Sequence, residues 1–240
     1  MAEISIAGQI LHPLAERALW WPAEQALIIA DLHLEKASAL ARTGQMLPPY
    51  DTVDTIERLT ALAAHWDARK IYALGDSFHD AAGPERLGHA ARDALIRLAK
   101  RAQIYWVEGN HDADAQIGDY LPGELYDEMD VAGLKLVHIA GQAPPAPGHG
   151  EISGHYHPKY RLRQRGQMLS RPCFLLAGQR IILPAFGTLT GGLDAASAPF
   201  DHLGPREALI CAGNSMHRFA IHPQVPRARH YGRNAAVLAK

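Results

Sequence analysis

Short apolar runs rich in Ile, Val and Leu recur along the chain and alternate, in its first half, with longer amphipathic segments. Such runs are typical of strands that are buried between helices. The predicted strands are Ile4 to Ala7, Ala26 to Ala30, Ile71 to Leu74, Ile104 to Val107, Leu134 to Ile139, Glu151 to Ser153, Cys173 to Ala177, Arg180 to Leu183, Ala208 to Cys211 and Met216 to Ile221.

Two segments carry apolar residues at every third or fourth position and predict helices, Asp51 to Trp66 and Pro84 to Lys100. Pro84 suits a first helical turn, where its missing N–H is not needed. After His138 the chain consists almost entirely of predicted strands and loops. The pattern therefore predicts an α/β fold that runs from alternating strands and helices into consecutive strands.

Residues that bind metals follow four of the predicted strands. They are Asp31 and His33 in ADLH, Asp76 in LGDSFHD, Asn110 and His111 in EGNHD, and His155 and His157 in GHYHP. In open α/β sheets, functional groups gather at the carboxyl ends of strands, because loops converge there on a crevice. We therefore expect these side chains to form one site.

Each motif has a simpler explanation when it is taken alone. Asp31 can cap a helix, and the GNHD segment can form a turn in which Gly109 and Asn110 adopt unusual backbone angles. The succession of motifs, each behind a predicted strand, favours the shared site instead. Their oxygen and nitrogen donors suit Mn²⁺, Fe or Zn²⁺ and are too many for one ion. Two ions about 3.5 to 4 Å apart can bridge a hydroxide and stabilise phosphoryl transfer, with Asp76 as the shared carboxylate.

Composition narrows the class of protein without naming a substrate. The 240 residues, 48% of them hydrophobic, suit a single compact domain over residues 1 to 240. A net charge of -1 lacks the overall basicity of many nucleic-acid-binding proteins, whereas 14 histidines again point to metal chemistry. The N-terminus has no signal-peptide pattern and no apolar run is long enough to span a bilayer, so we expect a cytoplasmic protein without a membrane partner.

The succession D-x-H, GD, GNHD and GHxH from Asp31 to His157 resembles the calcineurin-like metallophosphoesterase superfamily. That resemblance implies a four-layer sandwich, in which two β-sheets pack face to face with helices outside. By the same analogy, one ion would be held by Asp31, His33, Asp76 and His157, and the other by Asp76, Asn110, His138 and His155. His138 is preferred to His149 because it ends a predicted strand, whereas His149 lies in a Pro/Gly-rich loop.

Two further histidines are candidates for catalysis. His111 remains without an ion in this assignment, so it is our candidate general acid for the leaving oxygen. His79 lies in GDSFH, which resembles a signature of the recombination-repair nucleases of the superfamily. We expect it to orient His111 or contact the phosphate, and a surface histidine remains the alternative.

Longer stretches are similar to the ligase-associated DNA damage response endonucleases, the PdeM family. They are ERALWWPAEQALIIADLHLEK, SGHYHPKYRL, RPCFLL and LPAFGTLTGG. The resemblance implies a Mn-dependent phosphodiesterase or DNA endonuclease that works with a DNA ligase, a helicase and an exonuclease in bacterial DNA repair. One departure is Glu35, which stands where the DLHxGK pattern usually has Gly.

The chain carries a local basic stripe that suits a DNA substrate. Between Ile152 and Arg171 there is no acidic residue, and Arg161 and Arg163 are our candidates for substrate binding. A solvated strand face is the alternative. From about residue 222 the composition predicts a flexible basic tail, for which a role in binding and a merely solubilising role both stay open.

Two other functions remain open at this point. A small-molecule phosphatase or cyclic-nucleotide phosphodiesterase can use the same scaffold, because a fold does not determine its substrate. A non-catalytic, metal-stabilised scaffold that recruits repair proteins is the second rival. The intact set of donor residues, with His111 and Asp76 both present, argues against it.

Overall fold

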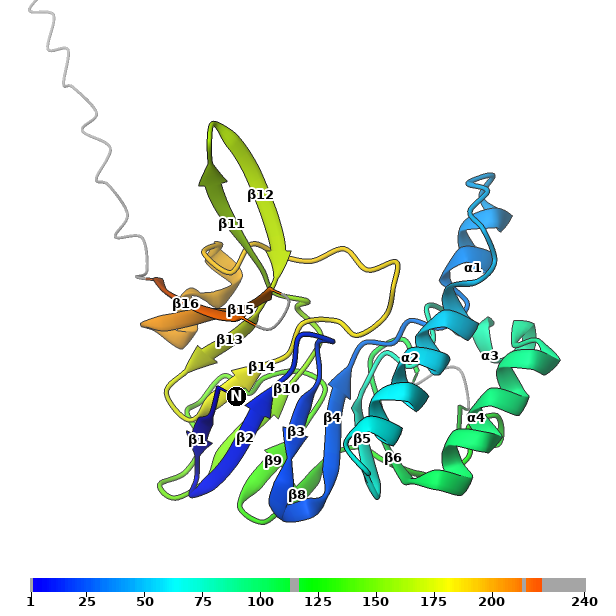
Figure 1. Ribbon diagram of the computed structural model, residues 1–240, viewed down its shortest axis with the longest axis horizontal. Coiled ribbons are helices and arrows are strands. Elements are labelled where there is room, and N and C mark those ends of the chain that lie inside the picture. Colours follow the sequence, from blue (N-terminus) through cyan, green and yellow to red (C-terminus); the bar gives the residue numbers. More distant parts are fainter. Residues whose placement is uncertain (1, 113–116, 213–214, 222–240) are drawn as a thin grey trace, which may run out of the picture.

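The computed structural model describes residues 2–112, 117–212 and 215–221, and its main body consists of two seven-stranded sheets (Figure 1). The basic tail expected from about residue 222 lies outside the described residues. The first sheet has the order β1 to β7. Its strands are β1 (Ile4–Ile6), β2 (Gln9–Pro13), β3 (Leu19–Trp21), β4 (Ala26–Ala30), β5 (Lys70–Leu74), β6 (Gln103–Val107) and β7 (Glu124–Tyr126).

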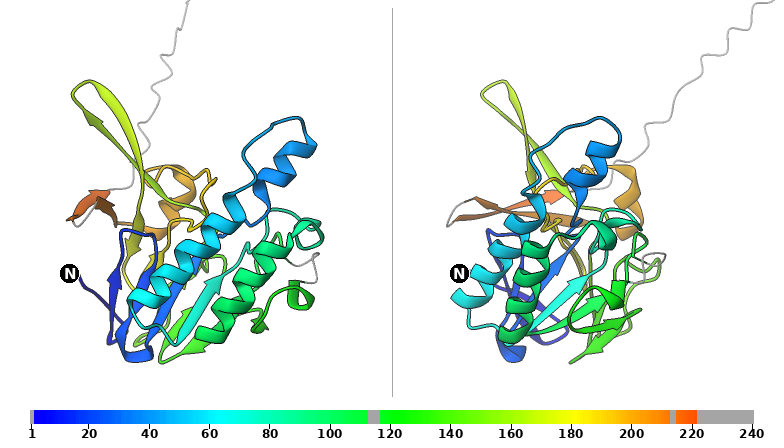
Figure 2. Two further views of the ribbon diagram at one scale, coloured as in Figure 1. Left: turned by 45° about the vertical axis from the view of Figure 1, so that its right-hand side comes forward. Right: turned by 90° about the vertical axis from the view of Figure 1, so that its right-hand side faces the viewer.

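The second sheet has the order β16-β15-β13-β14-β10-β9-β8. Its strands are β8 (Met129–Val131), β9 (Leu134–Leu136), β10 (Gly150–Ser153), β13 (Phe174–Ala177), β14 (Arg180–Ile182), β15 (Arg206–Ala212) and β16 (Ser215–Ile221). The remaining strands, β11 (Lys159–Gln164) and β12 (Gln167–Pro172), form a separate antiparallel hairpin. This hairpin projects from the body at the same end as helix α1 (Figures 1 and 2).

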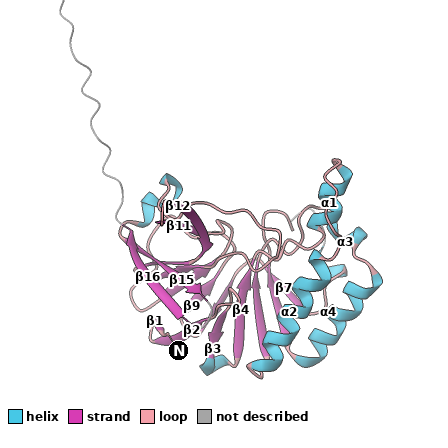
Figure 3. Cartoon of the chain, turned by 45° about the horizontal axis from the view of Figure 1, so that its top comes forward, coloured by secondary structure: helices cyan, strands magenta, loops and turns pink. Residues whose placement is uncertain are grey.

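Helices cover the outer face of the first sheet (Figures 2 and 3). The helices are α1 (Lys36–Arg42), α2 (Asp51–His65), α3 (Gly83–Arg86) and α4 (His89–Arg101), with 3-10 turns η1 (Pro22–Glu24), η2 (Ile117–Asp119) and η3 (Ala198–Leu203). Apolar side chains of α2 and α4, such as Ile56 and Leu98, join this face in one buried cluster. None of the helices in the described residues has the length and apolar character needed to cross a membrane.

The predicted single helix from Pro84 to Lys100 is wrong in one respect, because the structure divides it into α3 and α4. Leu87 and Gly88 take extended backbone angles at the junction. The turn buries the Leu87 side chain against the first sheet, and Gly88 begins the second helix at low conformational cost. Burial of Leu87 thus outweighs the helical period of the local sequence.

The expected four-layer arrangement is confirmed. A second buried cluster lies between the two sheets and includes Trp21, Tyr72 and Phe174. A third covers the far face of the second sheet, where Phe200 of η3 packs on strand residues such as Leu175. The outermost layer on that side consists of loops and a 3-10 helix, whereas α-helices form the layer outside the first sheet.

Candidate metal centre

Five strands deliver polar residues to one edge of the two sheets. The parallel strands β4, β5 and β6 are in register at their carboxyl ends, where Ala30 pairs with Leu74 and Leu74 with Val107. Asp31, Asp76 and Asn110 follow these ends in the next loops. In the second sheet, β9 and β10 are also parallel and precede His138, His155 and His157. Parallel pairing therefore brings residues from distant parts of the chain to one place.

The backbone at these residues is unusually strained. Five of the predicted ligands have left-handed backbone angles, with φ values of 55° at Asp31, 46° at His33, 47° at Asp76, 70° at His155 and 45° at His157. This conformation is uncommon for residues other than Gly and costs on the order of 1 to 3 kcal/mol each. It persists where surrounding contacts enforce it. Here it turns the side chains after each strand toward a shared centre.

Two glycines let the backbone come close to the ligand side chains. A Cβ atom at Gly75 would lie 2.1 Å from Nδ1 of His138, and one at Gly109 would lie 2.1 Å from the backbone nitrogen of Asp76. Neither position can take a larger residue without moving a predicted ligand. The glycines of the GD and GNHD motifs thus have a packing reason as well as a turn-forming one.

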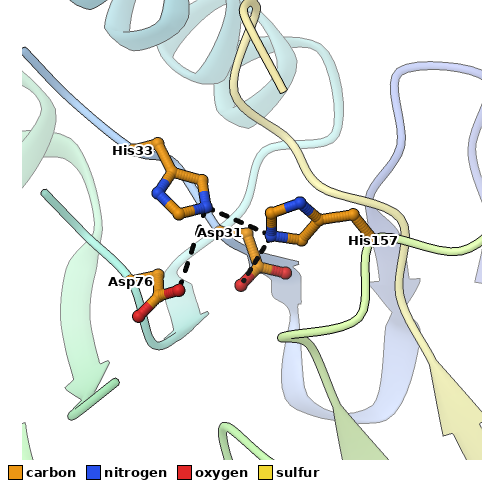
Figure 4. Close-up of side chains that lie close together, drawn as sticks. All are labelled: Asp31, His33, Asp76 and His157. Atoms are coloured by element: carbon orange, nitrogen blue, oxygen red, sulfur yellow. Dashed lines mark hydrogen bonds and ion pairs between the residues drawn. The ribbon is translucent and has the colours of Figure 1, made fainter. Parts of the chain in front are cut away.

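Asp31, His33, Asp76 and His157 each turn one donor atom toward the others (Figure 4). The four atoms lie within 4.8 Å of one another. Nε2 of His33 is 3.1 Å from Nε2 of His157 and 3.8 Å from Oδ2 of Asp76. Nε2 of His157 is 3.4 Å from Oδ1 of Asp31. We call this set the first donor group.

Asp76 also belongs to a second donor group with His138 and His155. Nε2 of His138 lies 3.4 Å from Oδ1 of Asp76 and 3.1 Å from Nδ1 of His155. The side-chain oxygen of Asn110 completes the set at 2.9 Å from the same Nε2. The two carboxylate oxygens of Asp76 therefore face different groups, Oδ2 the first and Oδ1 the second.

The donor set fits a divalent metal. Donors about 2.1 Å from one ion, at angles of about 90 to 110°, lie about 3.0 to 3.4 Å apart. The spacings of 2.9 to 3.4 Å in the second group and of 3.1 and 3.4 Å in the first are close to this range, and the 3.8 Å between His33 and Asp76 is longer. Nδ1 of His138 is 3.1 Å from the carbonyl oxygen of Leu74. A carbonyl only accepts, so this contact places the proton on Nδ1 and leaves the Nε2 lone pair for a metal.

Burial favours the neutral imidazole at His33 and His155. It lowers the pKa of His33 to about 2, assisted by the charges of His157 and Lys36. Burial also lowers the pKa of His155, and the charge of His138 lowers it further by a smaller amount. Because metal ligation needs the unprotonated ring, these two side chains have no proton to displace near neutral pH. Asp31 and Asp76 are buried among these rings and supply negative charge.

His111 and His79 lie beside the donor groups. The half-exposed His111 side chain has Nε2 4.0 Å from Oδ2 of Asp76, and its backbone N–H donates to Oδ1 of Asp76 over 3.1 Å. The His79 ring lies 6.2 Å from the His111 ring and 5.7 Å from the His33 ring. Burial, followed by the charge of Lys36, lowers the pKa of His79. The His111 imidazole thus borders the shared carboxylate, and the His79 ring lies next to the His111 and His33 rings.

The structure separates the other predicted residues from this centre. His149 is exposed, and its Nδ1 lies 3.3 Å from the carbonyl oxygen of Pro147, so the structure brings His138 to the donors in its place. Arg161 and Arg163 are exposed on β11 of the projecting hairpin. Nε of Arg161 lies 3.7 Å from Asp194, and neither arginine belongs to a donor group.

Asp112 is a residue of this centre that the sequence analysis missed. Its fully buried carboxylate accepts backbone N–H bonds from Ser77, Phe78 and Gly109 at 3.0 to 3.2 Å. Burial raises the pKa of Asp112 to about 6 despite these three donors. The carboxylate ties the loop after β5 to the loop after β6. The signal in the sequence was its place in GNHD, directly after two predicted site residues.

Lys36 is a second residue that was missed. It begins α1 three positions after His33, and its charge contributes to the lowered pKa of both His33 and His79, after burial. Burial lowers the pKa of Lys36 itself, and the nearby charge of Lys159 adds to the effect. The charge of Lys36 therefore acts on the first donor group, and Lys159 follows the donor residue His157 by two positions in the chain. The second donor group is instead bordered by carboxylates. Asn110 and His138 of that group line a hollow of about 370 Å³ together with Glu108, Asp127 and Glu128.

The solved structures that are similar to this chain include the crystal structure of the nuclease MPE from Pseudomonas putida. The sequences are 31% identical, the match covers 87% of this chain and 96% of the other, and the TM-score is 0.70. A protein of unknown function from Aquifex aeolicus is 17% identical in sequence. The match covers 59% of this chain and 81% of the other, with a TM-score of 0.39.

No protein-family model matches the sequence. No curated protein matches it either. The match to the Pseudomonas putida protein nevertheless extends over nearly the whole of that chain, at an identity high enough to show common descent. The chain therefore belongs to the same family as the nuclease MPE.

Proposed function

We propose that this protein is a metal-dependent phosphodiesterase that cleaves DNA as an endonuclease. The observation that carries the proposal is the pair of donor groups that share Asp76, with His111 on the open side of the shared carboxylate. A single shared carboxylate suits two ions, and paired ions are typical of phosphoryl-transfer sites. The family relationship to a nuclease supports a nucleic-acid substrate.

In this proposal, Asp31, His33, Asp76 and His157 hold one divalent ion, and Asp76, Asn110, His138 and His155 hold the other. Mn²⁺ is the expected ion, and the same donors also accept Fe or Zn²⁺. Bound together, the two ions would supply positive charge to the phosphoryl oxygens and lower the pKa of a bound water. Nδ1 of His138 keeps its ring oriented through the carbonyl of Leu74.

The remaining residues act on the substrate directly. His111 donates a proton to the leaving oxygen, because it is half-exposed and lies next to the shared carboxylate without belonging to a donor group. The neighbouring His79 contacts the phosphate or orients His111. Lys36 and Lys159 hold phosphate oxygens beside the first donor group, and Arg161 and Arg163 hold phosphates farther along the strand.

The cellular role follows from the resemblance and belongs to the same proposal. The long stretches similar to the PdeM endonucleases favour action in bacterial DNA repair, in the cytoplasm, together with a DNA ligase, a helicase and an exonuclease. The nuclease relative is compatible with this role. Co-purification of the tagged protein with such enzymes from cells with damaged DNA tests it, and absence of all three would contradict it.

The activity is tested with metal-stripped protein, a labelled oligonucleotide, a chromogenic phosphodiester and the matching monoester, each with and without Mn²⁺. We expect Mn-dependent DNA cleavage that Asp76→Ala abolishes, because this change removes a ligand from both donor groups. His149→Ala is the matched control, since its imidazole is exposed and distant from the donors. Turnover of the monoester or small diester with DNA left intact would instead favour the small-molecule phosphatase or phosphodiesterase.

A further inference from the structure

An apolar hollow of about 270 Å³ opens where the segment between α1 and α2 meets the loop after β14. Leu47, Pro48 and Tyr50 line it from one side, and Thr188 and Leu189 line it from the other. Tyr50 is 72% exposed, so a large ring stands in water at the rim. Large apolar side chains that gather around one hollow are typical of a binding site, whereas single exposed ones are common.

The loop that forms one wall of this hollow also borders the first donor group. The backbone N–H of Gly187 donates to the carbonyl oxygen of Asp31 over 3.1 Å. Farther along the same loop, Nζ of Lys159 donates to the carbonyl oxygen of Thr190 over 3.2 Å. Leu189 lies between these two anchors in the sequence. The hollow is therefore next to the candidate metal centre.

The opposite wall is fixed to the same centre. The start of α1 follows His33 closely, and two hydrogen bonds join it to the start of α2. Asp51 accepts from the backbone N–H of Ala37 over 2.9 Å, and Thr52 accepts from the backbone N–H of Glu35 over 2.7 Å. Tyr50 directly precedes these acceptors. Its position relative to the metal centre is thus determined by short contacts between helices.

The charges around the hollow indicate what it binds. Asp51 and Asp54 are among its lining residues, and their negative charges disfavour a phosphate inside it. The ammonium groups of Lys36, whose charge acts on His33, and of Lys159, whose Nζ donates to the carbonyl oxygen of Thr190, offer positive charge for the adjoining phosphates. The volume is just below the range of about 300 to 1,000 Å³ typical of pockets for drug-sized ligands, which suits a single ring system.

We propose that this hollow binds the nucleobase of a nucleotide next to the phosphodiester that is cleaved. Tyr50 stacks on the base, Leu47 and Leu189 contact its edges, and the carboxylates of Asp51 and Asp54 accept hydrogen bonds from exocyclic amino groups. Lys36 and Lys159 hold the phosphates that connect this base to the metal centre. The inference rests on the proposed nuclease activity and adds a base-binding subsite to it.

The test compares an intact oligonucleotide with a series of copies, each of which lacks the base at one position near the cleavage site. We expect loss of one flanking base to lower kcat/KM of the wild-type protein by about 5- to 150-fold, the range typical of one stacked base. Tyr50→Ala lowers kcat/KM on the intact oligonucleotide by a similar factor and is insensitive to loss of that base. Tyr50→Phe keeps the ring and the activity. Ile96→Ala is the control, since Ile96 is 48% exposed on α4.

A chromogenic diester without bases separates binding from damage to the metal centre. If the hollow binds a base, Tyr50→Ala leaves the turnover of this diester unchanged. A loss of turnover on the diester as large as the loss on the oligonucleotide would overturn the inference. Unchanged oligonucleotide cleavage by Tyr50→Ala would also overturn it, with the nuclease proposal intact. If the wild-type protein cleaves no nucleic acid, the nuclease proposal and the subsite fail together.

Discussion

At the scale of single residues, the centre depends on unusual conformations and buried charges that the surrounding fold enforces. Five of the predicted ligands have positive φ values, and Glu35, which replaces the usual Gly of the DLHxGK pattern, also has a φ of 62°. Glu35 shows that this turn does not require Gly, because the hydroxyl of Thr52 accepts its backbone N–H. Side-chain contacts here take over part of the role that glycine plays elsewhere.

The role of His111 is tested by the quality of the leaving group. His111→Ala is expected to lower kcat on DNA by about 10² to 10⁴, because an alkoxide needs a proton to leave. Turnover of a chromogenic diester should fall much less, since its phenolate leaves without help. Steady-state kinetics on both substrates measure the difference. Equal losses on both would mean that His111 acts on the metals or on folding.

Asp112 is expected to position the two loops that carry Asp76 and Asn110. Asp112→Ala leaves three buried N–H groups without an acceptor, so the free energy of unfolding should fall by about 3 kcal/mol. Asp112→Asn keeps one acceptor oxygen and should lose less. Denaturant unfolding of the metal-free variants measures this, with the exposed Asp93→Ala as control. A change within about 0.5 kcal/mol for Asp112→Ala would contradict the positioning role.

At the scale of secondary-structure elements, the projecting hairpin β11–β12 and helix α1 stand on the same side of the molecule as the strand ends with the metal-binding residues (Figures 1 and 2). The hairpin carries most of the basic stripe, and its Arg161 and Arg163 side chains are exposed. It pairs with neither large sheet. An element built in this way can hold a substrate without contributing to the metal centre.

Replacing Arg161 and Arg163 by Gln tests the hairpin. The loss of two phosphate contacts should weaken the binding of single-stranded DNA. The slope of log K against log[salt] should become shallower by about 1.4, because each contact contributes about 0.7 to it. Turnover of a small diester should stay unchanged. Binding measured by fluorescence anisotropy at several salt concentrations gives the slope, with Gln167→Ala as control. An unaltered slope would show that these arginines do not bind phosphates.

At the scale of the whole molecule, the metal centre lies where the two sheets meet. The backbone N–H of His155 donates to both oxygens of Asp31, and Nδ1 of His138 lies 3.1 Å from the carbonyl oxygen of Leu74, so the donors of both sheets are joined by direct contacts. Bound ions would add further links between the sheets. Metal binding is therefore expected to stabilise the complete fold.

This link predicts that Mn²⁺ raises the melting temperature of the metal-stripped protein. A ligand present at about 100 times its Kd stabilises the folded state by about 2.7 kcal/mol. His157→Ala and His155→Ala, which change different donor groups, should each retain one ion, and Asp76→Ala should lose affinity for both. Calorimetric unfolding with metal analysis of the dialysed proteins measures these effects. Retention of two ions by both histidine variants would contradict the proposed division of ligands.

The sequence by itself located ten of the sixteen strands in the described residues, helix α2 and the donor residues of the candidate site, and it missed elements such as β2, β11 and α1. Periodicity predicted β4 with its observed bounds and α2 within one residue, since both patterns are local consequences of burial. The predicted ligands other than His138 follow strands as expected, because each motif and its strand are adjacent in the chain. His138 was expected within the strand Leu134 to Ile139, but β9 ends at Leu136, two positions before it. The two sheets packed face to face were implied by the resemblance and are confirmed by the structure, whereas the order of their strands came from the structure alone.

Only the tertiary structure decided which distant residues meet. It divided the predicted helix from Pro84 at Leu87 and placed Asp112 between two loops. It also joined Leu47 and Leu189 in one hollow. The physical reason is that periodicity reports the environment of neighbouring residues, whereas these arrangements depend on packing and hydrogen bonds between segments that are far apart in the chain.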